Sequence, residues 1–136
     1  MIAGRKATGG RGRAGNDMVT TLLIVAIALV HVGIVVLEML LWTAPAGRRA
    51  FGLTAEFAQR TRVLGANQGL YNGFLVAGLV WALVEGPLNS GRVPALFFLS
   101  CVLVAGIFGA LTASRRILFV QAVPAAVALI ALFAGI

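Results

Sequence analysis

Two ionisable side chains, His31 and Glu38, interrupt a long apolar stretch near the start of the chain. A separation of seven residues is two helical turns, so both side chains point the same way from a helix. A carboxylate within a membrane is unfavourable unless it faces the protein interior with a partner, although near a helix end it can also reach the interface. We therefore expect Glu38 to be a partnered acid–base group, and His31 to be either a deeper proton carrier or a hydrogen-bonded packing residue.

A second stretch, residues 63–84, is apolar enough to cross a bilayer, yet it carries polar and small residues on separate helical faces. Four polar side chains share one face: Asn67, Gln68, Tyr71 and Asn72. On a 3.6-residue period these four span about 140° of arc. Glycines at four-residue steps occupy a second face: Gly65, Gly69 and Gly73. Such glycines let a neighbouring helix approach closely, so one face predicts packing and the other predicts polar contacts.

The polar residues gather in one half of the predicted membrane spans. Successive spans run in opposite directions, and a rise of 1.5 Å per residue puts Glu38, Asn67 and Gln121 at roughly 7 Å from one surface. This one-sided distribution predicts a pocket open to one side rather than a continuous channel. The residues predicted to bind a ligand there are Glu38, Trp42, Asn67, Gln68, Tyr71, Asn72 and Gln121.

The elements that must position these residues follow from the composition. Of the 136 residues, 60% are hydrophobic and 11% are charged, which is more apolar surface than a soluble domain of this length can bury. A span needs about 20 mostly apolar residues, and the continuous apolar runs favour helices over strands. We predict an all-α fold, a four-helix transmembrane bundle with short loops that occupies residues 18–136. Its helices are expected at about 18–42, 55–84, 93–113 and 117–136.

The segments outside these spans carry weaker signals. Residues 1–17 are rich in glycine and arginine without apolar periodicity, so we expect a disordered basic tail. Met18, directly before the apolar pattern, is a second candidate start of translation. In the first loop, Thr54 is expected to cap the second helix, with Glu56 in its first turn.

The net charge of +7 does not indicate nucleic acid as a partner, because the basic residues flank the predicted spans, where they set membrane orientation. The first and third loops hold six lysines and arginines, whereas the tail and second loop hold five, or one if translation starts at Met18. The second count predicts that the first and third loops are cytoplasmic and both chain ends are outside. A single histidine and a single cysteine without ligand spacing predict neither a metal site nor a cofactor.

Small residues predict which helices lie closest. The third span has Ala105, Gly109 and Ala113 at four-residue steps, a face that matches the glycine face of the second span. We expect the three glycines to pack against these positions in antiparallel order.

Several stretches resemble a known family. These are LEMLLWTAPAGRRAFGLTAEFA, ANQGLYNGFLVAGL, the run 97–109 and ILFVQAVPA, all similar to the small bacterial membrane proteins of domain of unknown function 1304. The N-Q-G-x-Y-N-G and E-M-x-x-W-T-x-P strings are the most specific part of the resemblance. It covers residues 18–136 and implies a multi-pass, four-span protein of the bacterial inner membrane, without an established activity.

Three functional hypotheses follow from these features. The leading one is a one-sided intramembrane pocket that binds a small apolar molecule, with proton chemistry by Glu38 and His31. The second is a proton-coupled exporter acting as a homodimer, since four short spans with one carboxylate resemble the small multidrug resistance transporters in outline. In the third, a structural membrane protein, the polar side chains only fix the packing of the helices within the lipid bilayer.

Overall fold

The computed structural model describes residues 13–136, and all of its regular elements over that range are helical. In chain order these elements are α1 (Arg13–Met39), α2 (Pro45–Phe51), α3 (Ala55–Arg60), α4 (Arg62–Glu85), the wide helical turn η1 (Gly86–Ser90), α5 (Arg92–Thr112), a second wide turn η2 (Leu118–Ala122), and α6 (Val123–Ala134). The all-α prediction therefore holds for the described part of the chain.

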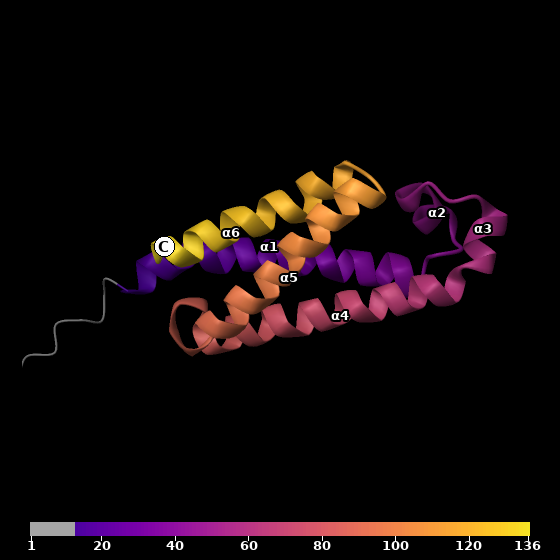
Figure 1. Cartoon of the computed structure of the whole chain (residues 1–136). Coiled ribbons are helices and arrows are strands. Elements are labelled where there is room, and N and C mark those ends of the chain that lie inside the picture. Colours follow the sequence, from indigo (N-terminus) through magenta and orange to yellow (C-terminus); the bar gives the residue numbers. More distant parts are fainter. Residues whose placement is uncertain (1–12) are drawn as a thin grey trace, which may run out of the picture.

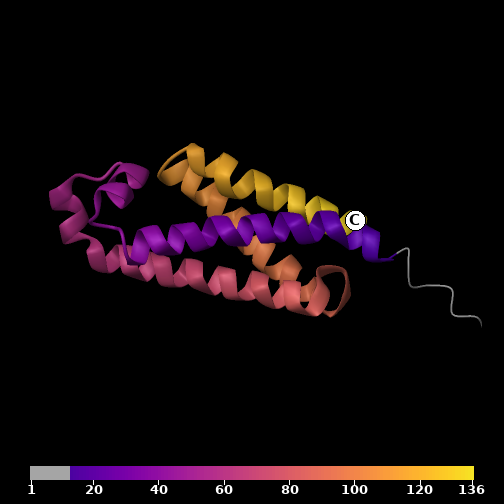
Figure 2. The ribbon, with the colours of Figure 1, turned by 180° about the vertical axis from the view of Figure 1, so that it is seen from behind.

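The four long helices form a bundle. Each of these helices contacts two of the others: α1 contacts α4, α4 contacts α5, α5 contacts α6, and α6 contacts α1. Figure 1 shows α4 and α6 on either side of α1, with α5 crossing obliquely, and Figure 2 shows the same arrangement from behind. The short helices α2 and α3 lie at one end of the bundle, and the C-terminus lies at the other (Figure 1).

Three helical segments are long and apolar enough to cross a membrane: Asp17–Met39, Arg62–Ser90 and Arg92–Thr112. The fourth apolar segment, Leu118–Ala134, is shorter. This segment was predicted as a span over 117–136, but it begins at Leu118 and ends where Gly135 adopts a left-handed conformation with φ 72°. The structure thus supports an all-helical protein with three membrane-length helices, and the fourth span remains a prediction.

Apolar side chains fill the core and also cover the outside of the bundle. Each long helix contributes one of the most deeply buried large side chains: Ile24, Leu79, Leu99 and Leu132. Other large apolar side chains are between 65% and 68% exposed, among them Leu29, Val104 and Ile130. An apolar exterior of this kind is unfavourable in water and suits a lipid environment.

Helix ends differ from the predicted ones at the N-terminal half of the chain. Residues 13–17, predicted as part of the disordered tail, are helical in α1, while the rest of that tail lies outside the described residues. The first helix ends at Met39 rather than at Trp42, and the predicted loop contains α2, whose first residue is Pro45. Proline has a fixed φ that suits the first turn of a helix, so it begins α2 here.

The predicted second helix is divided at Thr61 into α3 and α4. Its predicted cap is confirmed, because the Thr54 hydroxyl accepts a hydrogen bond of 3.2 Å from the backbone N–H of Phe57, with Glu56 in the first turn. The third predicted helix, over 93–113, corresponds to α5, which runs from Arg92 to Thr112 and is long and apolar enough to cross a membrane.

The predicted pairing of the glycine face with α5 is wrong. A Cβ at Gly65 would lie 2.5 Å from the Trp42 ring, and one at Gly69 would overlap the Met39 side chain, so both glycines face the end of α1. The third glycine, Gly73, has nothing within 4 Å of its Cβ position. Large side chains from the end of α1 and the following turn therefore pack over the first two glycines, where small residues of α5 were expected.

The small-residue face of α5 packs in the opposite direction, against the start of the last helix. A Cβ at Gly106 would lie 2.6 Å from the backbone nitrogen of Ala122, and one at Gly109 would lie 3.1 Å from the Ile117 side chain. The other two predicted packing positions, Ala105 and Ala113, are exposed. Glycine at these positions brings the backbone of α5 close to η2, an approach that a larger residue at Gly106 would prevent.

The last residues are fastened to the start of the first span. Both the backbone N–H and the hydroxyl of Thr20 donate hydrogen bonds to the carbonyl oxygen of Ile136. Thr20 is fully buried, so these bonds satisfy polar groups that solvent does not reach. This contact closes the α1–α6 side of the bundle at the end opposite α2.

Candidate functional site

Glu38 lies in the last turn of α1 and is 8% exposed. Its carboxylate accepts a hydrogen bond of 2.8 Å from the Asn72 side-chain amide of α4. The same amide also donates to the backbone carbonyl of Gln68, at 3.2 Å, within its own helix. Gly69 allows this contact, because the absence of a Cβ there lets the backbone of α4 approach Glu38 and Met39. The predicted partner for the buried acid is therefore present, and it is Asn72.

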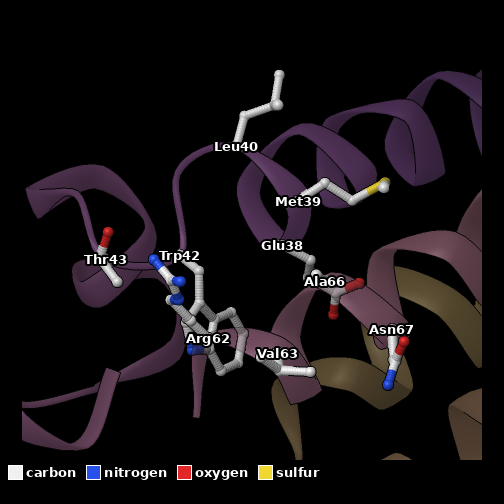
Figure 3. Close-up of a pocket in the computed structure, with 9 residues that line it drawn as sticks. All are labelled: Glu38, Met39, Leu40, Trp42, Thr43, Arg62, Val63, Ala66 and Asn67. Atoms are coloured by element: carbon white, nitrogen blue, oxygen red, sulfur yellow. The ribbon is translucent and has the colours of Figure 1, made fainter. Parts of the chain in front are cut away.

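A pocket of about 360 Å³ opens beside Glu38, at the end of the bundle that carries α2 and α3. It is formed by the end of α1, the following turn and the first residues of α4. Its lining consists of Glu38, Met39, Leu40, Trp42, Thr43, Arg62, Val63, Ala66 and Asn67. Figure 3 shows Glu38 and Asn67 on one side of the pocket and Trp42 with Arg62 on the other. The pocket thus combines an apolar wall with a carboxylate, an amide and a guanidinium group.

Trp42 forms a fixed wall of this pocket. Its indole Nε1–H donates a hydrogen bond of 3.1 Å to the Thr61 hydroxyl, which itself donates to the backbone carbonyl of Phe57 at 2.7 Å. The indole lies over Gly65, and its ring centroid is 5.1 Å from that of Phe51 in α2. These contacts hold the indole between α2, α3 and α4, so the pocket wall is preformed.

The structure brings together only part of the predicted ligand-binding set. Glu38, Trp42 and Asn67 line the pocket, and Asn72 is linked to it through its hydrogen bond with Glu38. Gln68 and Tyr71 are exposed on the outside of α4 and are absent from the pocket wall. Helical periodicity had placed them on the same face as Asn72. That face covers a wide arc of the helix, so Asn72 can contact α1 while Gln68 and Tyr71 point away from it.

Gln121, also predicted as a ligand-binding residue, lies in η2, which packs against α5 and α6. It is not among the residues that line the pocket. The prediction for Gln121 was based on its depth along the membrane normal, and depth does not define which side of the bundle a residue faces.

His31 is 1% exposed and lies in the interior of the bundle, outside the pocket wall. Its Nδ1 is 2.8 Å from the backbone carbonyl oxygen of Ile27. Because a carbonyl only accepts, Nδ1 carries the proton and donates it. This geometry corresponds to the hydrogen-bonded packing residue that was one of the two predicted readings of His31.

Sequence reasoning missed several pocket residues, chiefly Arg62 and Ala66. Arg62 is the first residue of α4, and Ala66 lies one turn later on the same face. An arginine directly before an apolar run marks the interface end of a span. The spacing of four places Arg62 and Ala66 on one side of α4, but only the structure shows that this side borders the pocket.

Fold and site together define a class: a small all-helical protein with membrane-length apolar helices and a buried, amide-bound carboxylate beside a pocket at one end. Comparison with known proteins is consistent with this class. Residues 25–133 match the family described as Protein of unknown function (DUF1304), and the chain belongs to this family.

One relative is the uncharacterized protein YpaA of Lactococcus lactis subsp. lactis (strain IL1403). It is 30% identical to this chain over 118 residues, which cover 85% of this chain and 98% of the relative. No solved structure matches the chain. The resemblance read from the N-Q-G-x-Y-N-G and E-M-x-x-W-T-x-P strings is therefore confirmed at the level of the family.

Proposed function

We propose that this protein resides in the bacterial inner membrane and binds a small, mostly apolar molecule in the pocket between α1 and α4. A polar group of that molecule, a hydrogen-bond donor or a cation, would meet the Glu38 carboxylate. The observation that carries the proposal is the position of Glu38, buried yet forming part of the pocket wall and held by Asn72.

Burial of an acid supports a binding role because an ionisable group at membrane depth is unfavourable and is retained mainly where it contacts a ligand, an ion or a partner. One amide hydrogen bond satisfies part of the carboxylate, which has further lone pairs available. The remaining lining supplies apolar contact from Met39 and Val63 and a flat indole face from Trp42. An amphiphilic molecule with one polar end fits this distribution better than a fully polar one.

Any proton chemistry on the bound molecule would be carried out by Glu38, because it is the carboxylate in the pocket wall. His31 lies two turns deeper in α1, roughly 10 Å along the helix axis, and hydrogen-bonds to its own helix. We therefore propose binding with at most one protein acid–base group at the ligand, and a supporting role for His31 in packing.

Trp42 provides a direct test, because it lines the pocket while the second tryptophan, Trp81, is 56% exposed elsewhere on α4. The purified chain would carry Trp81→Phe, which leaves Trp42 as the single tryptophan. A medium-chain bromoalkylamine, whose bromine quenches indole fluorescence, is then titrated in neutral detergent. Saturable quenching of Trp42 is expected, with a loss of saturation in the Glu38→Gln variant.

Two matched controls separate binding from partition into the micelle. In the Trp42→Phe variant, Trp81 should show only linear, non-saturable quenching. Ala66→Leu, which narrows the pocket, should weaken binding, whereas Ala77→Leu on an exposed part of the same helix should not. Equal, linear quenching of both tryptophans in the folded protein would contradict the proposal and favour a structural role for the polar residues. Membrane residence is tested separately by carbonate extraction of cell membranes.

A further inference from the structure

A second hollow, of about 530 Å³, lies on α2 and is distinct from the pocket beside Glu38. Its lining comprises Pro45, Arg48, Arg49, Gly52 and Leu53. From its position and charge we infer that it binds the phosphate of an anionic phospholipid headgroup. This inference rests on the membrane residence proposed above, and it is independent of any ligand in the α1–α4 pocket.

The two arginines of this hollow have hydrogen-bonding capacity that the described chain does not use. The Nε atom of Arg48 is buried and has no hydrogen-bond partner among residues 13–136. Arg49 donates a hydrogen bond from Nε to the backbone carbonyl of Pro45 at 3.2 Å. This bond orients the guanidinium group and does not use its two terminal nitrogen atoms. Buried donors are nearly always paired, and Arg48 lines the hollow, so we expect its guanidinium group to turn toward an acceptor that enters there. Phosphate oxygens match adjacent guanidinium groups in both charge and planar geometry.

The nearby acid does not neutralise these arginines. Glu56 of α3 forms an ion pair of 2.9 Å with Arg60 instead, one turn along the same helix. The other basic residues at this end of the bundle, Arg62, Arg115 and Arg116, add positive charge around the hollow. An anionic ligand would therefore be attracted to this end of the protein rather than repelled from it.

The hollow is held in a fixed shape by the local fold. Gly52 has a left-handed φ of 67°, and its backbone N–H and that of Leu53 both donate to the carbonyl of Arg48, which turns the chain sharply after α2. At the other side, Gly47 packs so closely on the backbone carbonyl of Leu41 that no side chain would fit between them. Both contacts fasten α2 beside the end of the first span, so its arginines are presented in one arrangement.

The expected depth of the hollow in the membrane favours a lipid as the source of the phosphate. It follows α1 directly in the chain, at the end where α1 leaves the predicted hydrocarbon region, which is the depth of the headgroups. Phe51 of α2 and Phe57 of the following helix α3 are 37% and 53% exposed and can contact acyl chains. Basic pockets beside membrane-spanning helices on the cytoplasmic side are a recurrent way of binding lipid headgroups.

The test compares lipid retention by native mass spectrometry of the full chain in neutral detergent, with added dioleoyl phosphatidylglycerol or dioleoyl phosphatidylcholine. The anionic lipid should bind preferentially. Combined Arg48→Gln and Arg49→Gln substitutions should weaken its retention by about tenfold or more, because each arginine near an anionic lipid contributes roughly fivefold. The matched control is Arg115→Gln with Arg116→Gln, which removes the same charge at the same end from residues outside the hollow and should weaken retention less than the Arg48 and Arg49 substitutions do.

Further arms keep the result interpretable. Arg48→Lys retains the charge but removes the unpaired Nε–H, and we expect it to bind more weakly than the wild type. Glu38→Gln should retain the lipid, since it alters only the other pocket. If the double variant does not fold, lipid retention is measured on Arg49→Gln alone, because Arg49 is exposed and its substitution is expected to leave the fold intact. Equal loss in both double variants, equal retention of the two lipids, or full competition by inorganic phosphate would each overturn the proposed lipid site.

Discussion

Asn72 of α4 holds the Glu38 carboxylate of α1 through a hydrogen bond of 2.8 Å, one turn along α4 from the glycine that lets the two helices approach. Replacing Asn72 by leucine leaves a buried carboxylate without this donor. We expect Asn72→Leu to lower the free energy of unfolding by about 1–2 kcal/mol, measured by titration with a denaturing detergent.

A double-mutant cycle isolates this interaction from other effects. Glu38→Leu combined with Asn72→Leu should be less destabilising than the sum of the single changes, because each substitution removes the same hydrogen bond. Gln68→Leu is the control, since its side chain is exposed and its backbone carbonyl is unchanged. Strict additivity of the two substitutions would show that the bond contributes nothing to stability.

Gly69 and Gly73 are expected to respond oppositely to the same substitution. A Cβ at Gly69 overlaps Met39, so Gly69→Ala should destabilise the protein by about 1–3 kcal/mol. At Gly73 nothing lies within 4 Å, so Gly73→Ala should be neutral or stabilise by up to about 1 kcal/mol through helix propensity. The same unfolding assay measures both variants, and a larger loss for Gly73→Ala would contradict the α1–α4 packing.

Thr20→Val tests the contact between the ends of α1 and α6. It removes the hydroxyl that donates to the Ile136 carbonyl and leaves the backbone donor in place. The expected loss of stability is about 1 kcal/mol. The neighbouring Thr21→Val, at a residue that is only half-buried, should change stability less, and a reversed order of the two effects would argue against the contact.

Membrane orientation gives a prediction that is independent of the pocket. In a Cys101→Ala chain that starts at Met18, a cysteine at the exposed Ser90 should react with a membrane-impermeant maleimide added to intact cells. A cysteine at the exposed Ala113, at the opposite end of α5, should react only after the membrane is permeabilised. The opposite labelling pattern would reverse the proposed orientation.

The sequence was sufficient to locate elements whose limits are set by polarity or by a local side chain. The ends of α5 coincide with the ends of a continuous apolar run, and the Thr54 cap depends on a residue only three positions away. The helix α2 was missed because the residues between the predicted helices 18–42 and 55–84 were assigned to a loop, although a proline such as Pro45 favours the first turn of a helix.

Long-range packing was harder to predict, because periodicity defines a face but not its partner. The glycine face of α4 requires a close neighbour, which small residues of α5 could have supplied, but Met39 of α1 and Trp42 of the following turn pack there instead. The same limitation explains Gln121, which lies at the expected end of the bundle but on a different side of it. Glu38 and Trp42 were correctly placed in the pocket because both lie where α1 ends, so little depended on helix pairing.

The unequal surroundings of Gly69 and Gly73 also bear on how such chains diverge over evolutionary time. A residue larger than glycine at position 69 would require a smaller neighbour at Met39, so the two positions should change together among descendants of a common ancestor. Position 73 has free space around it and can drift without a compensating change in α1. Covariation between 39 and 69, with independent variation at 73, is therefore the evolutionary signature expected of this helix pair.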